Sequence, residues 1–249
     1  MLASTYWASP SHDIFLSLAP GVVHVWRAHL EDSPLQASRY LPYLSTDERA
    51  RAERFRIPHH KYRFVSSRGI LRKLLSHYAG VPAANLRIES NLQGKPTLTD
   101  PSLLPLQFNV SHTSGMALLA VTVERPVGID VERIDRAVRD HDIAARYFSP
   151  RESAYLASLS PDHRTREFLT YWTCKEAYLK MRGIGLSGGL AQCEIALDPD
   201  GVKAEVSLTD GQSRASTCSL FRVNAGQEHI GALAVSWPAV EVSFWDWKD

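Results

Sequence analysis

The stretch from Phe168 to Ser187, FLTYWTCKEAYLKMRGIGLS, constrains the fold more than any other part of the chain. Its density of aromatic and apolar residues is typical of a helix that is mostly buried. Glu176 and Lys180 lie four residues apart, so a helix places them on one face, where they can form an ion pair. Gly183 is expected to end the helix, because glycine readily takes positive φ. Taken alone, the stretch favours a structural helix whose ion pair adds little to stability.

A second acidic segment, GIDVE at Gly128 to Glu132, lies upstream of this helix. Its apolar residues and carboxylates alternate, which predicts a strand that points Asp130 and Glu132 from one face and Ile129 and Val131 into the core. Two carboxylates on one face repel each other unless a cation lies between them. Ligands that are all oxygen favour a hard divalent ion, so the segment indicates a Mg²⁺ site, and Mn²⁺ accepts the same ligands.

Two apolar runs indicate an internal repeat. Ala117 to Val123 (ALLAVTV) resembles Gly231 to Trp237 (GALAVSW), and each run lies well downstream of a helix with an aromatic-rich start. The same order of elements in both halves predicts an α+β fold made of two similar lobes. The boundary is expected near Pro126, which gives an N-terminal lobe of residues 1–125 and a C-terminal lobe of residues 126–249. Ligands are expected in the cleft between the lobes.

Composition argues against several classes of protein. The formal net charge of +1 gives no general case for nucleic-acid binding. No apolar run approaches the ~18 residues of a membrane span, and residues 1–20, expected to be a loose leader, lack the pattern of a signal peptide. Cys174, Cys193 and Cys218 form no C-x-x-C pair, which favours a reducing, cytoplasmic setting. Because one chain would supply both walls of the cleft, a monomer is expected.

A basic region follows Ser45 and Thr46, either of which is suited to cap the start of a helix. Its arginines and lysines are Arg49, Arg51, Arg54, Arg56, Lys61, Arg63, Arg68, Arg72 and Lys73. Such a run can be a solvated helix face or an anion-binding site, and the residues alone leave both open. A longer helix is predicted from Tyr62 to Tyr78, ended by Gly80.

The chain also carries FNVSHT at Phe108 to Thr113, GIDVE at Gly128 to Glu132, and WTCKEAYLK at Trp172 to Lys180 followed by GIGLS at Gly183 to Ser187. Together they resemble the three signature motifs of the 4'-phosphopantetheinyl transferases. More narrowly, the chain is similar to the surfactin-synthetase-activating (Sfp) type, in which one chain holds two similar lobes related by pseudo-two-fold symmetry, with the active site between them. The match runs from about Ser45 to Ser187, in the family's order and at its spacing.

The resemblance implies a holo-[acyl-carrier-protein] synthase. Such an enzyme transfers the 4'-phosphopantetheine arm of coenzyme A to a serine of an apo acyl or peptidyl carrier protein and releases adenosine 3',5'-bisphosphate. The carrier can serve fatty-acid, polyketide or nonribosomal-peptide synthesis, and the sequence does not distinguish these.

Four catalytic roles of the family carry over to residues of this sequence. The resemblance implies that Asp130, Glu132 and Glu176 hold Mg²⁺. It also implies that Glu176 accepts the serine proton, directly or through a metal-bound water, and that Lys180 neutralises the leaving phosphate. Glu152 matches another acidic position of the family and is given a supporting catalytic role, although Ser149 to Glu152 is equally a capped helix start.

Contacts with coenzyme A carry over in the same way. The matching positions are Arg51 for the 3'-phosphate, Lys95 and Pro96 for the adenine, and Ser111 and His112 for the pyrophosphate and the 3'-phosphate. Glu48 departs from the pattern, because the surfactin-type relatives carry lysine there. This exchange is expected to weaken the 3'-phosphate clamp, and Arg54 or Arg63 is expected to compensate.

Two other functions stay open at this point. One is a non-catalytic protein that binds coenzyme A or carrier proteins, which is expected to lose a metal carboxylate. The other is a Mg²⁺-dependent phosphohydrolase, which would use the same three carboxylates with water as the nucleophile. Residues 188–249 match the family poorly, and Trp245 and Trp247 near the end are expected either to pack on the body or to form a patch for a partner.

Overall fold

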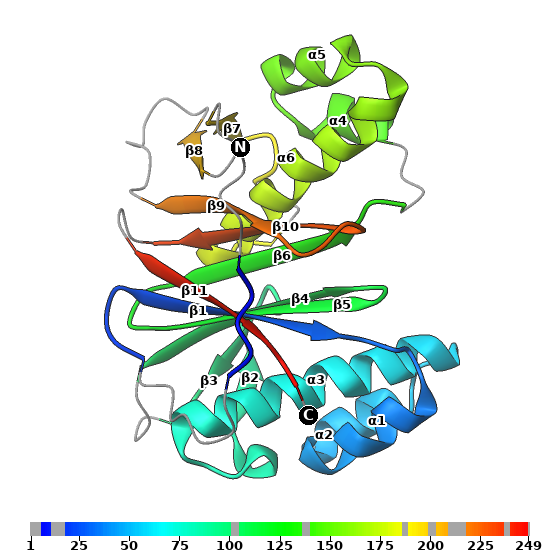
Figure 1. The fold of residues 1–249 in the computed structure, drawn as a ribbon, viewed down its shortest axis with the longest axis vertical. Helices are drawn as coiled ribbons and strands as arrows, with labels where there is room; N and C mark the ends of the chain where they lie inside the picture. The colour runs from blue at the N-terminus through cyan, green and yellow to red at the C-terminus, as the bar shows by residue number, and fades with distance from the viewer. Residues whose placement is uncertain are drawn as a thin grey trace.

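The protein is built in layers, with helices covering the outer face of each of two stacked sheets (Figure 1). The structure is a computed structural model, and it describes residues 6–10, 18–100, 105–135, 140–185, 189–198, 203–208, 218–236 and 240–248. Ser187 of the last motif and most of the expected leader lie outside the described residues.

The described part of the chain alternates helices and strands. The helices are α1 (Pro34–Tyr40), α2 (Thr46–Ala52), α3 (Pro58–Ala79), α4 (Asp140–Tyr147), α5 (Pro150–Ser158) and α6 (Pro161–Arg182), with 3-10 turns η1 (Leu41–Tyr43) and η2 (Ala83–Asn85). The strands are β1 (Val22–His29), β2 (Ile88–Ser90), β3 (Pro96–Leu98), β4 (Leu106–Thr113), β5 (Met116–Val123), β6 (Val127–Arg133), β7 (Cys193–Leu197), β8 (Lys203–Leu208), β9 (Ser219–Asn224), β10 (His229–Val235) and β11 (Glu241–Asp246).

The two lobes repeat one order of elements. In the first lobe β1 precedes the long helix α3, and the strands β4 and β5 follow it. In the same way, in the second lobe β6 precedes the long helix α6, and the strands β9 and β10 follow it. Both long helices have 22 residues, begin with proline and end at a glycine with positive φ, 66° at Gly80 and 68° at Gly183. The sheets have the orders β11-β1-β5-β4 and β6-β10-β9-β8-β7, and β2 and β3 form a separate hairpin. The predicted α+β fold of two similar lobes is confirmed.

Three apolar clusters hold these layers together. One packs α1 and α3 on the first sheet, with Leu71 and Leu119 fully buried, and the second packs α6 on the second sheet. The third lies between the sheets and includes Leu118, Ile129 and Leu233. The strand predicted at GIDVE therefore does send Ile129 into a core, as its alternation indicates. The lobes are joined by this apolar layer, so the space open to a ligand lies outside it.

The predicted helix boundaries are largely confirmed. Ser45 caps α2 and forms a capping box with Glu48, and Ser149 forms the same arrangement with Glu152 at the start of α5. The helix predicted from Tyr62 to Tyr78 is α3, which begins earlier because Pro58 is well suited to a first helical position.

The last strand crosses back to the first lobe. β11 runs parallel to β1 in the first sheet, Trp245 stacks on Trp26 with ring centroids 5.9 Å apart, and the indole nitrogen of Trp247 donates to the Tyr40 hydroxyl at 3.0 Å. The tail therefore packs on the body. The expected division at residue 126 also needs correction, because residues 241–246 belong to the sheet of the N-terminal lobe.

Residues 6–10 are not a loose leader. The indole nitrogen of Trp7 donates to the Asn224 carbonyl at 2.8 Å, and the amide of Ala8 donates to the Phe244 carbonyl at 2.9 Å. These bonds tie the segment to β9 of one lobe and to β11 of the other. The expectation of a leader fails here because a tryptophan near an apolar interface gains more by packing than by remaining solvated.

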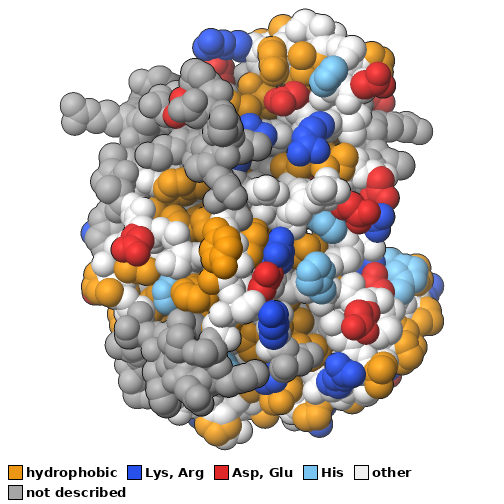
Figure 2. Space-filling view, viewed as in Figure 1, with side chains coloured by type: hydrophobic (Ala, Val, Ile, Leu, Met, Phe, Trp, Pro, Cys, Tyr) orange, Lys and Arg blue, Asp and Glu red, His pale blue; other side chains and the backbone are white. Residues whose placement is uncertain are grey.

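The surface carries both signs of charge. Lysine and arginine side chains are interspersed with aspartate and glutamate on the face shown in Figure 2, in keeping with the formal net charge of +1. Among the helices in the described ranges, none has the length and apolar character needed to cross a membrane.

Candidate active site

Strand β6 and helix α6 touch with no side chain between them at Gly128. A Cβ atom at this position would lie 2.0 Å from the Ala177 carbonyl oxygen and 2.3 Å from the Met181 amide nitrogen. Only glycine permits such an approach of strand and helix backbones. The contact holds the strand that carries Asp130 against the helix that carries Glu176.

Three carboxylates converge beside this contact. Asp130, Glu132 and Glu176 each offer one oxygen, and these oxygens lie within 4.8 Å of one another. Asp130 is only 2% exposed, and its Oδ2 accepts no hydrogen bond from any residue that the structure describes. A buried carboxylate oxygen without a partner is costly, and a hard cation would satisfy it. The donor set therefore fits Mg²⁺ or Mn²⁺, as GIDVE predicts.

Lys180 supplies positive charge to the cluster. Its Nζ donates to Asp130 Oδ1 at 2.5 Å and to Ser111 Oγ at 3.1 Å, and it lies 3.4 Å from Glu176 Oε2. Ser111 Oγ in turn donates to Asp130 Oδ1 at 2.8 Å. Burial opposes the charge on Lys180, but Asp130 and Glu176 outweigh this effect and raise its pKa. The FNVSHT motif thus contacts both other motifs through Ser111.

Among the described carboxylates, Glu176 has a strongly perturbed protonation. Its pKa is raised to about 7, first by burial and then by the charge of Asp130, against the opposing effect of Lys180. Its side chain is 12% exposed, so it is screened only weakly by water. A carboxylate with a pKa near neutrality can take up a proton at physiological pH, which is the property of a general base.

Both lobes line the cavity beside these groups. It has a volume of about 280 Å³, and its walls include Lys95, Pro96 and Asn109 from the first lobe and Glu176 and Lys180 from the second. The location between the lobes agrees with the expected position of the ligand site. Lys95 and Pro96, which the resemblance assigns to coenzyme A, therefore share one cavity with Glu176, which it assigns to the metal.

Lys95 joins the two lobes at the rim of this cavity. Its Nζ donates to the Val127 carbonyl at 3.0 Å and to the Met181 carbonyl at 3.2 Å. Met181 is in the last turn of α6, where cations are favoured. Desolvation lowers the pKa of Lys95 to about 8. The β2–β3 turn is thereby fastened to the second lobe, with Asn91 Oδ1 accepting from the Lys95 amide at 2.8 Å.

A second cavity adjoins the first on the side of α2 and α3. It has a volume of about 220 Å³ and shares Gly94, Pro96 and Val110 with the first cavity. Arg51, Arg68 and His112 are among its other lining residues. The guanidinium of Arg51 lies over the Phe64 ring, 5.1 Å from its centroid. Of the proposed coenzyme A contacts, Arg51, Pro96 and His112 therefore meet here.

Burial and the nearby positive charges both favour the neutral form of His112. Its ring is exposed to the cavity, and its pKa is lowered, first by desolvation and then by the charges of Arg63 and Lys180. The ring is therefore neutral at pH 7 in the free protein, and a bound phosphate would favour its protonated form.

The arginines expected to compensate for Glu48 lie elsewhere. Both Arg54 and Arg63 are absent from the lining of the two cavities. The Arg63 Nε donates to Asp32 Oδ1 at 2.9 Å, and a second bond from its Nη2 to Asp32 completes a bidentate pair. Their binding roles stay predictions, and the structure offers them no contact with the cavity walls.

Glu152 lies apart from the carboxylate cluster. It is 3% exposed, accepts a hydrogen bond from the Ile195 amide at 2.8 Å and pairs with Lys175 Nζ at 2.8 Å. Lys175 also donates to the Leu190 and Cys193 carbonyls. These contacts are structural: they fasten α5 to α6 and β7. The supporting catalytic role of Glu152 stays a prediction, and the alternative of a capped helix start agrees with the geometry.

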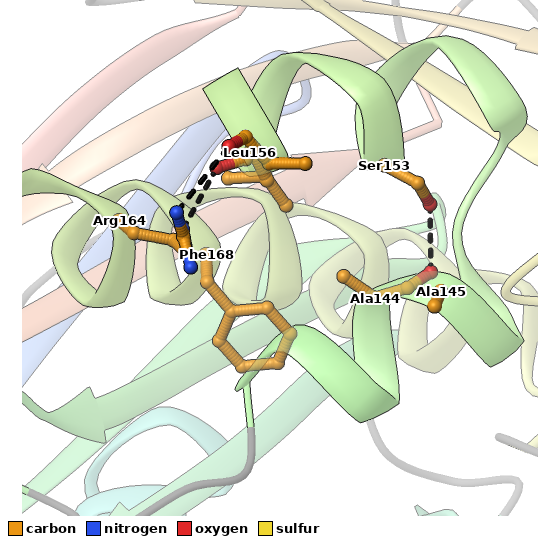
Figure 3. A pocket seen from close by; sticks show the side chains of 7 residues that line it. Ala144, Ala145, Ser153, Leu156, Arg164 and Phe168 are labelled. Atoms are coloured by element: carbon orange, nitrogen blue, oxygen red, sulfur yellow. Dashed lines mark hydrogen bonds between the residues drawn. The ribbon is translucent and has the colours of Figure 1, made fainter. Parts of the chain in front are cut away.

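A small cavity of about 20 Å³ lies between α4, α5 and α6 (Figure 3). The Arg164 Nε donates to the Leu156 carbonyl at 3.0 Å, and Ser153 Oγ donates to the Ala144 carbonyl at 2.8 Å. Its volume suits about one water molecule, and these polar side chains already have partners. It is therefore a packing feature of the helices rather than a ligand site.

Two residues beside the site were not singled out in the sequence. Asn109, in FNVSHT, accepts a hydrogen bond from the Ile129 amide at 2.9 Å through its Oδ1 and so positions β6 beside β4. Arg68 was one member of the basic run, and nothing in the run distinguished it. A helical wheel places Arg68 and Arg72 on one face of α3, and this is the signal that could have marked them.

Three carboxylates suited to a divalent cation, next to a lysine and an arginine-lined cavity, are typical of enzymes that act on phosphate esters. A family model described as the 4'-phosphopantetheinyl transferase superfamily matches residues 126–234, and one described as the N-terminal part of 4'-phosphopantetheinyl transferase matches residues 28–124. The chain belongs to the 4'-phosphopantetheinyl transferase superfamily, which confirms the predicted family and class of enzyme.

Relatives cover almost the whole chain. The 4'-phosphopantetheinyl transferase HetI of Nostoc sp. (strain PCC 7120 / SAG 25.82 / UTEX 2576) is 36% identical over 98% of this chain and 99% of its own. A 4'-phosphopantetheinyl transferase of Bacillus subtilis is 30% identical over 83% of this chain and 90% of its own. A crystal structure of a holo-(acyl-carrier-protein) synthase from Bacillus anthracis in complex with CoA (3',5'-ADP) is 23% identical over 44% of this chain and 93% of its own, with a TM-score of 0.37.

Proposed function

We propose that this chain transfers the 4'-phosphopantetheine arm of coenzyme A to a serine of an apo carrier protein, with a divalent cation at Asp130, Glu132 and Glu176. The observation that carries the proposal is the convergence of three carboxylate oxygens within 4.8 Å, next to Lys180, beside a cavity that both lobes line and that Glu176 and Lys180 reach. Membership of the superfamily and the 36% identity to HetI support it.

The cation that fits the cluster is Mg²⁺, with Mn²⁺ accepted by the same oxygens. Bound there, it would neutralise the pyrophosphate and act as a Lewis acid. The three ligands are matched to this task because Asp130 already presents a buried oxygen without a partner among the described residues.

The chain's own residues would handle the proton and the charge. The serine oxygen attacks the phosphorus that bears the pantetheine arm, and the bond from this phosphorus to the oxygen of adenosine 3',5'-bisphosphate breaks. Glu176, with a pKa of about 7, accepts the serine proton directly or through a water molecule. Lys180 balances the negative charge that grows on the leaving phosphate. Lys95 holds the β2–β3 turn against α6, which keeps the wall of the cavity in place.

The test is the intact mass of apo carrier proteins incubated with the chain, coenzyme A and Mg²⁺. Fatty-acid, polyketide and nonribosomal-peptide carriers are tried in parallel. A gain of about 340 Da, the mass of one phosphopantetheine arm, is expected with a suitable carrier, and chelation of the metal is expected to abolish it. The variant Glu176→Gln should lose the gain, whereas Glu167→Gln, earlier in the same helix, should keep it.

Two results would replace this proposal. If coenzyme A binds but no carrier gains mass, the chain is a non-catalytic binding protein. If phosphopantetheine is released from coenzyme A in the absence of a carrier, the chain is a metal-dependent phosphohydrolase. The first is disfavoured at present because all three carboxylates are in place.

A further inference from the structure

The N-terminal strap, residues 6–10, has no part in the proposed reaction, yet it joins the two lobes. Its backbone belongs to the first sheet, because the Ala8 amide donates to the Phe244 carbonyl of β11 at 2.9 Å. The neighbouring Trp7 reaches the second sheet instead, where its indole nitrogen donates to the Asn224 carbonyl of β9 at 2.8 Å. One side chain therefore bonds the second lobe from a backbone that is anchored in the first.

The ring of Trp7 is held in place by the first lobe. It packs against the apolar cluster between the sheets and meets the Phe244 ring edge to face, with centroids 5.2 Å apart. The Arg27 guanidinium lies 4.5 Å from its centroid, and Arg27 is fixed by two bonds to Asp246, at 2.7 and 3.0 Å. Edge-to-face and cation–π contacts both favour this position of the ring. The indole nitrogen is thus aimed at the second lobe before any ligand binds.

The bond of Trp7 reaches a row of residues that ends at the proposed metal site. Asn224 is in register with Ile230 of β10, and Ile230 is in register with Glu132 of β6. Neighbouring strands lie about 4.8 Å apart and are joined by backbone hydrogen bonds, so such a row moves as a unit. A displacement of Asn224 relative to the first lobe therefore moves Glu132 in the same direction.

The lobes also contact each other at the opposite edge of the first sheet, where β4 faces β6. There Ser111 donates to Asp130 at 2.8 Å, and Lys180 donates to both side chains. These are the groups that would meet the cation and the leaving phosphate, so their contacts with each other have to change during the reaction. Trp7 lines neither of the two cavities, and its bond can persist while these contacts change.

Two directional links at opposite edges set the angle between the sheets. The apolar layer between them holds the sheets together, but the hydrophobic effect has no direction and sets the angle only loosely. The bond from the Ile129 amide to Asn109 at 2.9 Å links the lobes at the edge beside the active site. With this link alone the lobes could rock about it, and the bond of Trp7 at the far edge opposes that motion.

We propose that Trp7 is a positioning residue for coenzyme A, which fixes the angle between the lobes from the far edge and thereby the width of the cavity that both lobes line. This role rests on the proposed function, because coenzyme A is taken as the ligand of the cavity. Trp7 and β11 lie outside residues 28–124 and 126–234, the ranges that the family models match. By linkage, bound coenzyme A strengthens the bond of Trp7 by the factor by which the bond strengthens coenzyme A binding.

The experiment measures the affinities of coenzyme A and of Mg²⁺ alone by calorimetric titration of the full chain. Trp7→Phe keeps an aromatic ring beside Arg27 and loses only the N–H group. It is expected to weaken coenzyme A about 3-fold to 10-fold, the usual effect of losing one hydrogen bond. Mg²⁺ should stay within about twofold, because its three carboxylate ligands all belong to the second lobe. Trp247→Phe is the matched control, since the Trp247 indole bonds Tyr40 at 3.0 Å within the first lobe, and it should change neither affinity.

Hydrogen exchange tests the reciprocal effect without any substitution. Coenzyme A is expected to slow the exchange of the Ala8 amide about 3-fold to 10-fold in the unaltered chain, although Ala8 lies at the far edge from the cavity. In Trp7→Phe this slowing should be lost. A tryptophan that only stabilises the fold predicts faster exchange in Trp7→Phe by the same factor with and without coenzyme A, and that result would overturn the positioning role.

Kinetics separate this role from the proposed function. In carrier modification, Trp7→Phe should raise KM for coenzyme A and leave kcat within about twofold, because Glu176 and Lys180 both belong to the second lobe. If the unaltered chain modifies a carrier but Trp7→Phe binds coenzyme A as tightly, or Trp247→Phe weakens it equally, the positioning role is refuted and the transferase stands. If the unaltered chain neither binds coenzyme A nor modifies a carrier, the proposed function itself fails.

Discussion

The raised pKa of Glu176 makes the metal-free protein less stable as the pH increases. The folded state keeps the Glu176 proton up to a pH of about 7, whereas the unfolded chain loses it near 4.5, the ordinary value. Between these values the folded state binds more protons than the unfolded state, so the free energy of unfolding falls as the pH rises. A shift of this size corresponds to about 3 kcal/mol, all of it lost above a pH of about 7.

Glu176→Gln should remove this loss, because glutamine does not ionise. In EDTA at pH 8, the variant is expected to be up to about 3 kcal/mol more stable than the unaltered chain, less the small contribution of the lost contact with Lys180. For a chain of this size, that is a rise in Tm of about 6 to 12 °C. At pH 4 the two proteins should have nearly equal stability, since Glu176 is then protonated in both states.

Urea unfolding at half-unit steps from pH 4 to pH 8 measures the effect. Glu228→Gln, which removes an exposed carboxylate of the same lobe, is the control and should follow the unaltered chain. Mg²⁺ at 100 times its Kd should restore about 2.7 kcal/mol to the unaltered chain and nothing to Glu176→Gln. Parallel stability curves for the unaltered chain and Glu176→Gln across this pH range would refute the reasoning, because they would mean that Glu176 titrates normally in the folded state.

Two substitutions test how the site is supported. Gly128→Ala is expected to cost at least about 3 kcal/mol in urea unfolding and to weaken Mg²⁺ binding, because its methyl group would lie 2.0 Å from the Ala177 carbonyl oxygen. Gly231→Ala should cost less, because its methyl group would meet the end of the Leu118 side chain at 2.8 Å and the Asp130 carbonyl oxygen at 3.1 Å. Equal costs of the two substitutions would contradict this account. Lys175→Met should lower the free energy of unfolding by about 3 to 5 kcal/mol, because it leaves Glu152 buried and unpaired. Adding Glu152→Gln should recover much of this loss in the same assay, and no recovery would contradict the importance of the ion pair.

The sequence predicted those parts of the site that depend on local pattern. Alternation in GIDVE placed Asp130 and Glu132 on one strand face, and helical spacing placed Glu176 beside Lys180. The same local rules predicted the cap at Ser45 and the glycine ends of both long helices. The motif order, through the family it resembles, then joined these pieces into one site.

Long-range pairings could not be predicted in this way. The pairing of Glu48 with Arg68 and Arg72 joins two helices and depends on the angle between them, which no periodicity encodes. The pairing of Glu152 with Lys175 depends on how α5 docks on α6. The position of β11 was missed for the same reason, because a strand's neighbours are set by the whole sheet and not by its own residues.

The return of β11 to the first sheet also affects how the chain is made. During synthesis at about 5 to 20 residues per second, β1 emerges early, but its parallel partner is more than 200 positions later in the sequence, since Val22 pairs with Glu241. Until then one edge of β1 has unpaired backbone groups that can recruit a strand from another chain. We therefore expect the nascent first lobe to depend on chaperones, and variants that weaken β11 to aggregate during expression even where the finished active site is intact.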